Sequence, residues 1–249
     1  MLKYLIYNAA AYLLPKSIIN ILGSLKVLKS LRDWLFDRNM VLKPRRLITW
    51  NNLEFYFQAP LQILRKARIH GIENSLTKSI LNVVNKDSNI IDIGSNYGFI
   101  TLVCSIYIKE GKGTVFSFEC DTHCYKNLEC SISKNGLKNI QLFNEFLGNE
   151  NNSNMKTVDS LLYGKCENID LIKIDTDGTD FECLKGCTQI INQFHPVIVI
   201  EINNNFDQII KYLKEMGYRY FYDQFLRKVD DNLNTNVPNL FSSKYGLKV

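Results

Sequence analysis

Long apolar runs are absent from this sequence, in which no stretch reaches the roughly 18 uncharged apolar residues of a membrane-spanning helix. A cleavable secretory signal is not expected either. Asn8 interrupts the short apolar run of residues 1–14, Pro15 ends it, and no small-residue cleavage site follows. We therefore expect a cytoplasmic protein without a spanning helix.

Cysteine occurs seven times but lacks the paired spacing of a metal site or a disulfide framework. Cys120, His123 and Cys124 resemble half of a zinc site, but no second Cys or His pair is spaced to complete the tetrahedron. The cysteines are therefore expected to be reduced thiols, as in the cytosol.

Charge of one sign is not concentrated in any part of the chain. Lysine and arginine number 30 against 25 acidic residues, and the formal net charge is +5. The two basic clusters, at residues 43–46 and 65–68, are too short for a nucleic-acid surface and are interpreted as solvated faces. Nucleic acid is therefore not an expected partner.

The N-terminal part of the chain predicts two amphipathic helices within residues 2–35, separated by Pro15. Two interpretations of their apolar stripe remain open. The stripe packs on the main domain or on a second subunit, or residues 1–35 make peripheral contact with an anionic membrane, because basic side chains interleave it. These basic residues are Lys16, Lys26, Lys29 and Arg32.

An alternating aromatic segment at residues 47–59 predicts a hairpin that turns at Asn51 and Asn52. Residues 1–71 are accordingly expected to form a helical N-terminal extension with a hairpin. The main domain is expected at residues 72–249, and the 46% hydrophobic content suffices for its core.

The main domain shows short β-rich runs that alternate with helical segments. Strands are expected at residues 90–93, 114–118, 140–143, 171–174, 197–202 and 218–222, and helices at 75–84, 99–109, 123–134, 181–191 and 206–216. A final hairpin is expected from residues 225–229 and 241–247. This alternation is typical of parallel βαβ units and predicts a doubly wound, mostly parallel α/β sheet.

A glycine-containing turn follows the first of these strands. Its residues are Asp92, Gly94, Ser95, Asn96 and Gly98. Glycines in such a turn allow a ligand to approach the backbone closely. The spacing differs from that of the dinucleotide fingerprint, so NAD is disfavoured.

Glu119 ends the next strand, where a carboxylate is able to accept hydrogen bonds from both ribose hydroxyls. Since ligands bind at the carboxyl ends of parallel strands, this carboxylate and the glycine turn together predict a site for an adenosine-containing ligand.

Acidic residues gather after two later strands. Asp175, Asp177 and Asp180 follow the strand that contains Lys173, and Glu201 ends the adjacent strand. Asp175 is expected to face the cleft. Asp177 and Asp180 have an alternative role as caps of the helix that begins near residue 181.

Four ordered segments resemble the FkbM family of class I methyltransferases. They are Ile91–Gly98, Val115–Asp121, Asp170–Gly186 and Pro196–Ile202, and the resemblance extends over roughly residues 72–225. It implies a seven-stranded Rossmann-like sheet, S-adenosylmethionine as cofactor, and methyl transfer to a hydroxyl oxygen of a sugar or another small polar acceptor.

The resemblance also implies roles for individual residues. Asp92, Gly94, Asn96 and Gly98 would line the methionine end of the cofactor, with Ser95 in the same turn, and Glu119 would hold the ribose. The chain departs from the family pattern at Asp177 and Asp180, where glutamate is usual, and at Cys120, where proline commonly follows the ribose acid.

Asp175 is the candidate base that orients and deprotonates the acceptor, with Lys173 and Glu201 as electrostatic helpers. Lys173 has the alternative of pairing with a neighbouring acid, and Asp175 with Glu201 has the alternative of binding a divalent metal. A second functional hypothesis is a catalytically inactive adenosine-ligand-binding module that acts as a membrane-attached scaffold. The sequence predicts no oligomeric state.

Overall fold

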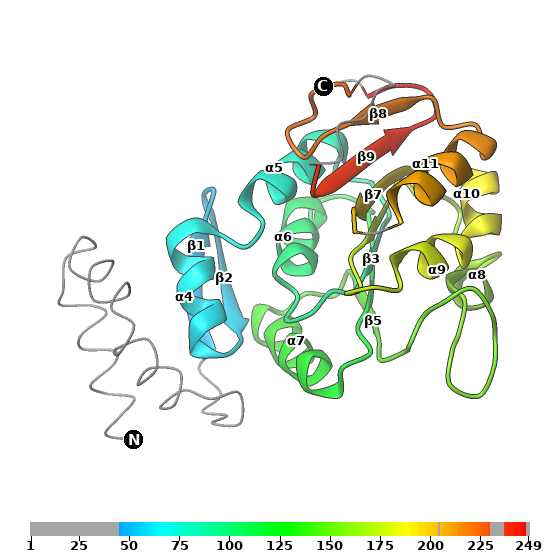
Figure 1. Cartoon of the computed structure of the whole chain (residues 1–249). Coiled ribbons are helices and arrows are strands. Elements are labelled where there is room, and N and C mark those ends of the chain that lie inside the picture. Colours follow the sequence, from blue (N-terminus) through cyan, green and yellow to red (C-terminus); the bar gives the residue numbers. More distant parts are fainter. Residues whose placement is uncertain (1–44, 204, 230–236, 248–249) are drawn as a thin grey trace, which may run out of the picture. The chain divides into compact units, whose positions relative to one another are not determined.

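The computed structural model describes residues 45–203, 205–229 and 237–247 (Figure 1). The amphipathic helices expected within residues 2–35 lie outside the described residues. The chain divides into two compact units, residues 1–43 and residues 44–249, and every described element belongs to the second unit.

An antiparallel hairpin of β1 (Arg45–Trp50) and β2 (Leu53–Gln58) begins the described chain. Asn51 and Asn52 form its turn with φ angles of 48° and 65°. Two-residue hairpin turns require such left-handed angles, which Asn tolerates well. The predicted hairpin is therefore confirmed.

Helices and short strands alternate through the rest of the chain. The helices are α4 (Leu61–His70), α5 (Asn74–Val83), α6 (Phe99–Ile108), α7 (Thr122–Asn135), α8 (Val158–Leu162), α9 (Asp180–Lys185), α10 (Thr188–Phe194) and α11 (Phe206–Glu215). The strands are β3 (Ile90–Ile93), β4 (Val115–Phe118), β5 (Ile140–Phe143), β6 (Leu171–Ile174), β7 (Val197–Glu201), β8 (Tyr220–Tyr222) and β9 (Asn239–Ser243). Within the described residues, no helix is both long and apolar enough to cross a membrane.

Seven strands form one sheet in the order β5-β4-β3-β6-β7-β9-β8. The first five strands in this order are parallel, and β9 is antiparallel to both β7 and β8. The chain runs outward from β3 through β4 to β5 and then returns to β6 on the other side of β3. The predicted doubly wound sheet is thus confirmed, and its strand order reverses at β3, where such sheets bind ligands.

The alternation of side chains along the strands divides the core between the two faces of the sheet. Ile90 and Leu171 pack with the hairpin and with α5, α6 and α7, whereas Ile91 and Ile172 pack with α8, α9, α10 and α11 (Figure 1). Because the side-chain period of a strand is two residues, polar side chains two positions after Ile90 and Leu171 project toward the α5–α6 side.

The single helix expected at residues 181–191 is wrong, because Gly186 separates α9 from α10. A Cβ at Gly186 would lie 2.1 Å from the carbonyl oxygen of Gly148, so glycine allows two backbone segments to meet there. The carboxylate of Asp159 in α8 then accepts hydrogen bonds from two backbone N–H groups of α10, at 2.8 and 3.0 Å. A contact distant in sequence therefore stabilises the break.

The final hairpin expected from residues 225–229 and 241–247 is also wrong. β9 instead inserts between β7 and β8. The carboxylate of Asp223 accepts hydrogen bonds from the backbone N–H groups of Phe225 and Arg227, at 2.8 and 3.0 Å. This local bonding favours a turn over a strand, because the side chain occupies the backbone donors that a ladder would need.

Candidate functional site

The turn after β3 requires glycine at position 94. Gly94 has a φ of 73°, and a Cβ there would lie 1.8 Å from the backbone carbonyl oxygen of Asp175. The backbone N–H groups of Gly94 and Ser95 both donate to the carbonyl oxygen of Phe118, at 3.0 Å. The turn therefore joins the carboxyl ends of β3, β4 and β6.

Glu119 directly follows β4, and its carboxylate binds the backbone of this turn at Asn96. Its Oε2 accepts a hydrogen bond from the backbone N–H of Asn96 at 2.6 Å, and its Oε1 accepts one from that of Asp121 at 2.7 Å. Burial raises the pKa of Glu119, and these two hydrogen bonds oppose the rise. Each oxygen keeps a second lone pair, so the carboxylate is able to accept hydrogen bonds from two hydroxyl groups as well.

Ser95, Asn96 and Gly98 shape the remainder of the turn. Asn96 has a left-handed φ of 53°. A Cβ at Gly98 would lie 2.1 Å from a leucine side chain of α7, so glycine allows α6 to begin close to that helix. Ser95 is buried and its hydroxyl donates to a carbonyl of β4 at 3.3 Å. The structure thus brings residues 94–98 and Glu119 together.

Asp92 and Lys173 form a buried ion pair beneath the turn. They face each other in the register of β3 and β6. Lys173 Nζ lies 3.4 Å from Asp92 Oδ1, and the side chains are 4% and 1% exposed. The Thr101 hydroxyl donates to Asp92 Oδ2 at 2.5 Å. Asp92 therefore supports the turn from below, and its contact with a cofactor remains a prediction.

Lys173 also contacts the residues that follow β3 and β6. Its Nζ lies 3.4 Å from Asp175 Oδ2 and donates to the carbonyl oxygen of Gly94 at 3.3 Å. Burial alone would lower the pKa of Lys173, but the carboxylates of Asp92 and Asp175 outweigh burial and raise it. The ammonium group therefore stays charged at neutral pH, and the pairing with neighbouring acids is confirmed.

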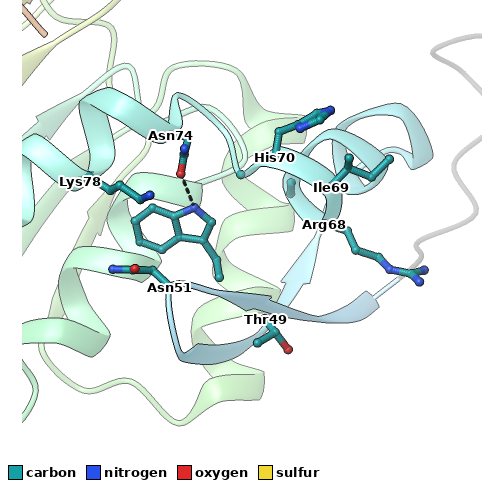
Figure 2. A pocket seen from close by; sticks show the side chains of 10 residues that line it. Thr49, Asn51, Arg68, Ile69, His70, Asn74 and Lys78 are labelled. Atoms are coloured by element: carbon teal, nitrogen blue, oxygen red, sulfur yellow. Dashed lines mark hydrogen bonds between the residues drawn. The ribbon is translucent and has the colours of Figure 1, made fainter. Parts of the chain in front are cut away.

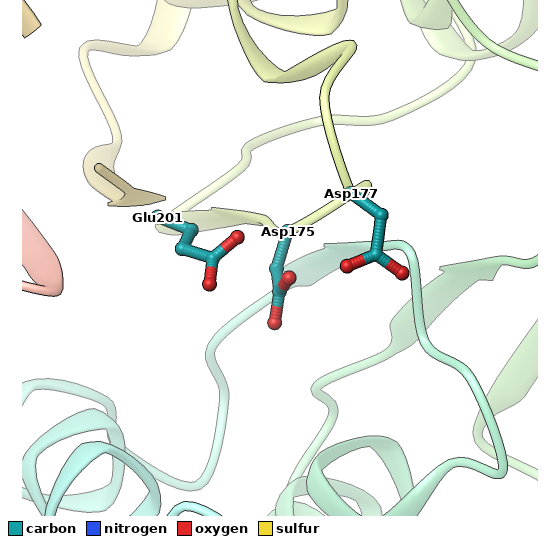
Figure 3. A group of neighbouring side chains, drawn as sticks. All are labelled: Asp175, Asp177 and Glu201. Carbon is teal, nitrogen blue, oxygen red and sulfur yellow. The ribbon is translucent and has the colours of Figure 1, made fainter. Parts of the chain in front are cut away.

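Asp175, Asp177 and Glu201 form a cluster of three carboxylates at the ends of β6 and β7 (Figure 3). One oxygen of each lies within 4.8 Å of the others. Burial raises the pKa of Glu201; a hydrogen bond from Asn203 opposes this rise, and the neighbouring acids add to it. Oxygen atoms at this spacing are able to hold a divalent cation or to accept hydrogen bonds from a polyhydroxyl ligand.

Asp180 has a structural role outside this cluster. Its carboxylate is buried and accepts hydrogen bonds from the backbone N–H groups of Thr176 and Gly178, at 2.8 and 3.3 Å. Asp180 therefore holds the loop before α9, and the expected helix cap is wrong, because the N-cap residue of α9 is Thr179 and no side chain caps it. The carboxylate of Asp177 joins the cluster instead. A small cavity of about 80 Å³ adjoins the cluster, and it is lined by Gly178, Asp180, Glu201, Asn203, Asn205 and Ile209.

Two residues at this edge of the sheet are not predicted from the sequence. Thr101 supports Asp92, and its only sequence signal is a hydroxyl inside the mainly apolar helix α6. Glu73 precedes α5 in a left-handed conformation, with φ and ψ both 48°. Burial raises the pKa of Glu73 and the charge of Lys173 opposes the rise, so Glu73 lies in the electrostatic field of the site. No motif indicates this placement.

The methyltransferase FkbM domain model matches residues 132–220 of the chain. The matched range contains Lys173, Asp175 and Glu201, and it begins after the Gly94 turn and Glu119. No curated protein sequence matches the chain significantly.

Solved methyltransferase structures share the fold. The methyltransferase FkbM of Methylobacillus flagellatus KT superposes with a TM-score of 0.52 at 15% identity, and the match covers 64% of this chain but only 44% of that one. Precorrin-6y C5,15-methyltransferase of Geobacter metallireducens GS-15 has a TM-score of 0.52 at 14% identity, with coverage of 76% and 95%. A SAM-dependent O-methyltransferase of Thermotoga maritima has a TM-score of 0.51 at 16% identity, with coverage of 81% and 78%.

At these identities the likeness concerns the fold, and it confirms the predicted class I methyltransferase sheet. Together with the matched domain model, it supports the motif-based family prediction. Residues 132–220 thus match the methyltransferase FkbM domain, which is the family that the motifs predict.

Proposed function

We propose that this protein is an S-adenosylmethionine-dependent methyltransferase that binds its cofactor over the carboxyl ends of β3 and β4. One observation carries the proposal: the 2.6 Å hydrogen bond from Asn96 to Glu119 joins the glycine turn and the strand-end acid into one surface, next to the point where the strand order reverses. Residues 94–98 line the methionine end and Glu119 accepts the ribose hydroxyls. The FkbM domain and the methyltransferase fold support this assignment.

Glu119→Ala is expected to weaken the binding of S-adenosylmethionine and S-adenosylhomocysteine by about 1.5 to 3 kcal/mol, the range for losing charge-assisted hydrogen bonds. Isothermal titration calorimetry measures this loss. Glu110→Ala is the matched control, because Glu110 is exposed and follows the carboxyl end of α6. Unchanged affinity in Glu119→Ala would remove Glu119 from the site. A wild-type protein that binds neither compound would refute the proposed function.

We further propose that the acceptor is a hydroxyl oxygen of a sugar or another small polar molecule. Asp175, Asp177 and Glu201 present several hydrogen-bond acceptors to the same region, which suits a ligand rich in hydroxyl donors. The preference for a sugar rests on the family resemblance. Mass spectrometry of products made with deuterated cofactor should place the methyl group on oxygen, and consistent methylation of nitrogen would contradict the acceptor class.

Asp175 is suited to orient the acceptor hydroxyl and to take its proton. Its side chain is 21% exposed, so an acceptor is able to reach it. Lys173, at 3.4 Å, stabilises the carboxylate without contacting the acceptor, and Glu201 completes the acidic edge. The bound cofactor would supply a methyl group on a positively charged sulfur atom.

Asp175, Asp177 and Glu201 are also the residues that would hold a divalent cation if the site used one. We expect turnover to be insensitive to a chelator, because the proposed role of these carboxylates is to bind the acceptor. Activity assays with EDTA, followed by addition of Mg²⁺, test this expectation. Loss of turnover that Mg²⁺ restores would instead assign the carboxylates to a metal.

Residues 1–35 remain the proposed segment for peripheral membrane contact, with packing on protein as the alternative. Flotation with anionic liposomes separates the two, using the full chain and a chain that begins at residue 36. Flotation of the full chain alone supports membrane contact, whereas flotation of neither supports packing. Membrane attachment together with cofactor binding but without turnover on any acceptor would favour the inactive scaffold.

A further inference from the structure

A network of buried polar side chains lies next to the glycine turn and connects four elements. Its members are Ser117 of β4, Thr101 of α6, Asp92 of β3 and Lys173 of β6, and all four are buried. Polar groups without access to water need partners inside the protein. The orientation of each member therefore depends on the others.

The hydrogen bonds of the two hydroxyl groups have a defined direction. The Thr101 hydroxyl donates its single proton to Asp92 Oδ2 at 2.5 Å, because an ionised carboxylate only accepts. Ser117 Oγ lies 3.1 Å from Thr101 Oγ1. Since the proton of Thr101 is already used, the Ser117 hydroxyl is the donor in this second contact. Both hydrogen bonds thus run toward Asp92.

The two oxygens of Asp92 have different partners. Oδ2 accepts from Thr101, whereas Oδ1 has no hydrogen-bond partner among the described residues and lies 3.4 Å from Lys173 Nζ. The same Nζ lies 3.4 Å from Asp175 Oδ2 and donates to the carbonyl oxygen of Gly94 at 3.3 Å. An ammonium group has three N–H donors, and Lys173 therefore has one donor for each of these three neighbours.

Aromatic packing fixes the first turn of α6 independently of the Thr101 hydroxyl. Three rings of the hairpin meet the Phe99 ring edge-on, with centroid distances of 5.9, 5.6 and 5.8 Å for Trp50, Phe55 and Phe57. The indole Nε1 of Trp50 in turn donates to Asn74 Oδ1 at 2.9 Å (Figure 2). Phe99 precedes Thr101 by two residues, so removal of the hydroxyl should leave the helix in place and act on Asp92 alone.

Building on the proposed function, we propose that Thr101 is a positioning residue of the cofactor site, which holds Asp92 so that Lys173 stays bound to the carbonyl of Gly94. Without the Thr101 hydroxyl, Asp92 Oδ2 is a buried charged oxygen without a donor, and such an atom is costly. Lys173 Nζ, already 3.4 Å from Oδ1, would then turn toward Asp92 and away from Gly94. The turn would lose this hydrogen bond, although Thr101 itself contacts no atom of the cofactor.

The test measures the affinity for S-adenosylhomocysteine by calorimetric titration. Thr101→Val replaces the hydroxyl with a methyl group of similar size, and its dissociation constant should rise about threefold to tenfold, the scale of one net hydrogen bond. Thr101→Ser keeps the hydroxyl and loses only a methyl group. Its affinity should equal that of the wild type.

Ser105→Ala is the matched control for lost stability. Ser105 lies one turn later in α6 and is equally buried, and its hydroxyl donates to Asn139 Oδ1 at 2.7 Å. This variant removes a buried hydroxyl from the same helix without changing a partner of Asp92. The melting temperature should fall in Thr101→Val, in Thr101→Ser and in Ser105→Ala, but only Thr101→Val should lose affinity. Affinity and stability are thereby separated.

Unchanged affinity in Thr101→Val would overturn the inference, and so would equal losses in Thr101→Val and Thr101→Ser. A loss of the same size in Ser105→Ala would also overturn it, because affinity would then follow the stability of α6. Thr101→Cys, whose thiol is a weaker donor, should show a smaller loss in the same direction and replaces Thr101→Val if that variant does not fold. All these results leave the proposed function intact, whereas a wild type that does not bind S-adenosylhomocysteine refutes both proposals.

Discussion

Asp175→Asn should lower turnover on the true acceptor by about 100-fold or more while cofactor affinity stays nearly constant. The substitution keeps the shape of the side chain but removes its ability to accept a proton. Asp175 Oδ2 lies 3.4 Å from Lys173 Nζ, and Lys173 retains its ion pair with Asp92 in the variant. The melting temperature should therefore change little. Steady-state kinetics and calorimetric titration with S-adenosylhomocysteine measure the two quantities separately.

Asp177→Asn is the matched comparison, because Asp177 belongs to the same carboxylate cluster but is exposed and makes no ion pair with Lys173 among the described residues. Its effect on turnover should be smaller and should appear mainly in the KM of the acceptor. Near-normal turnover in Asp175→Asn would contradict the assignment of Asp175 as the base. Equal losses in the two variants would indicate that the cluster binds the acceptor as a unit and holds no single base.

Lys173→Met should destabilise the folded protein by about 3 to 5 kcal/mol, the usual cost of removing one partner of a buried ion pair. Methionine has a similar length, so the change leaves little empty volume. It does leave the Asp92 carboxylate, 1% exposed, without its ammonium partner. For a domain of this size the melting temperature should fall by roughly 6 to 20 °C. Differential scanning calorimetry or thermal circular dichroism measures the shift.

A double variant tests the electrostatic origin of this loss. Asp92→Asn combined with Lys173→Met removes both charges and should recover much of the stability, because an uncompensated carboxylate is no longer buried. Lys126→Met, on the exposed surface of α7, should change the melting temperature little. Failure of the double variant to recover stability would mean that Lys173 contributes through packing or its hydrogen bond to Gly94, and not through its charge.

Two kinds of local pattern in the sequence were sufficient to predict the centre of the fold. The strands β3, β4, β5, β6 and β7 lie within one residue of their predicted bounds, because each is a short β-rich run between helical segments. The Gly94 turn and Glu119 were recognisable because each directly follows a strand. Parallel strands bring such residues to one edge whatever the rest of the chain does.

Helix bounds and the C-terminal strand pairing were less predictable. The break at Gly186 depends on the close approach of Gly148, and helical periodicity continues through it. β9 inserts between β7 and β8, whereas adjacency in sequence favours a simple hairpin. The reason is the same in both cases: each outcome depends on contacts between segments that are far apart in the chain.

The sequence by itself determined the class of sheet, the family motifs and the residue types available at the strand ends. Only the tertiary structure decided how these groups contact one another. Lys173 donates to the carbonyl oxygen of Gly94 and lies between the carboxylates of Asp92 and Asp175. Asp177 joins the carboxylate cluster, whereas Asp180 accepts a hydrogen bond from the backbone of the loop before α9. Glu73 illustrates the limit most clearly. The carboxylates of Asp92 and Asp175 act electrostatically on Glu73 because α5 packs against the sheet. Periodicity is a local property of the chain and carries no information about such contacts.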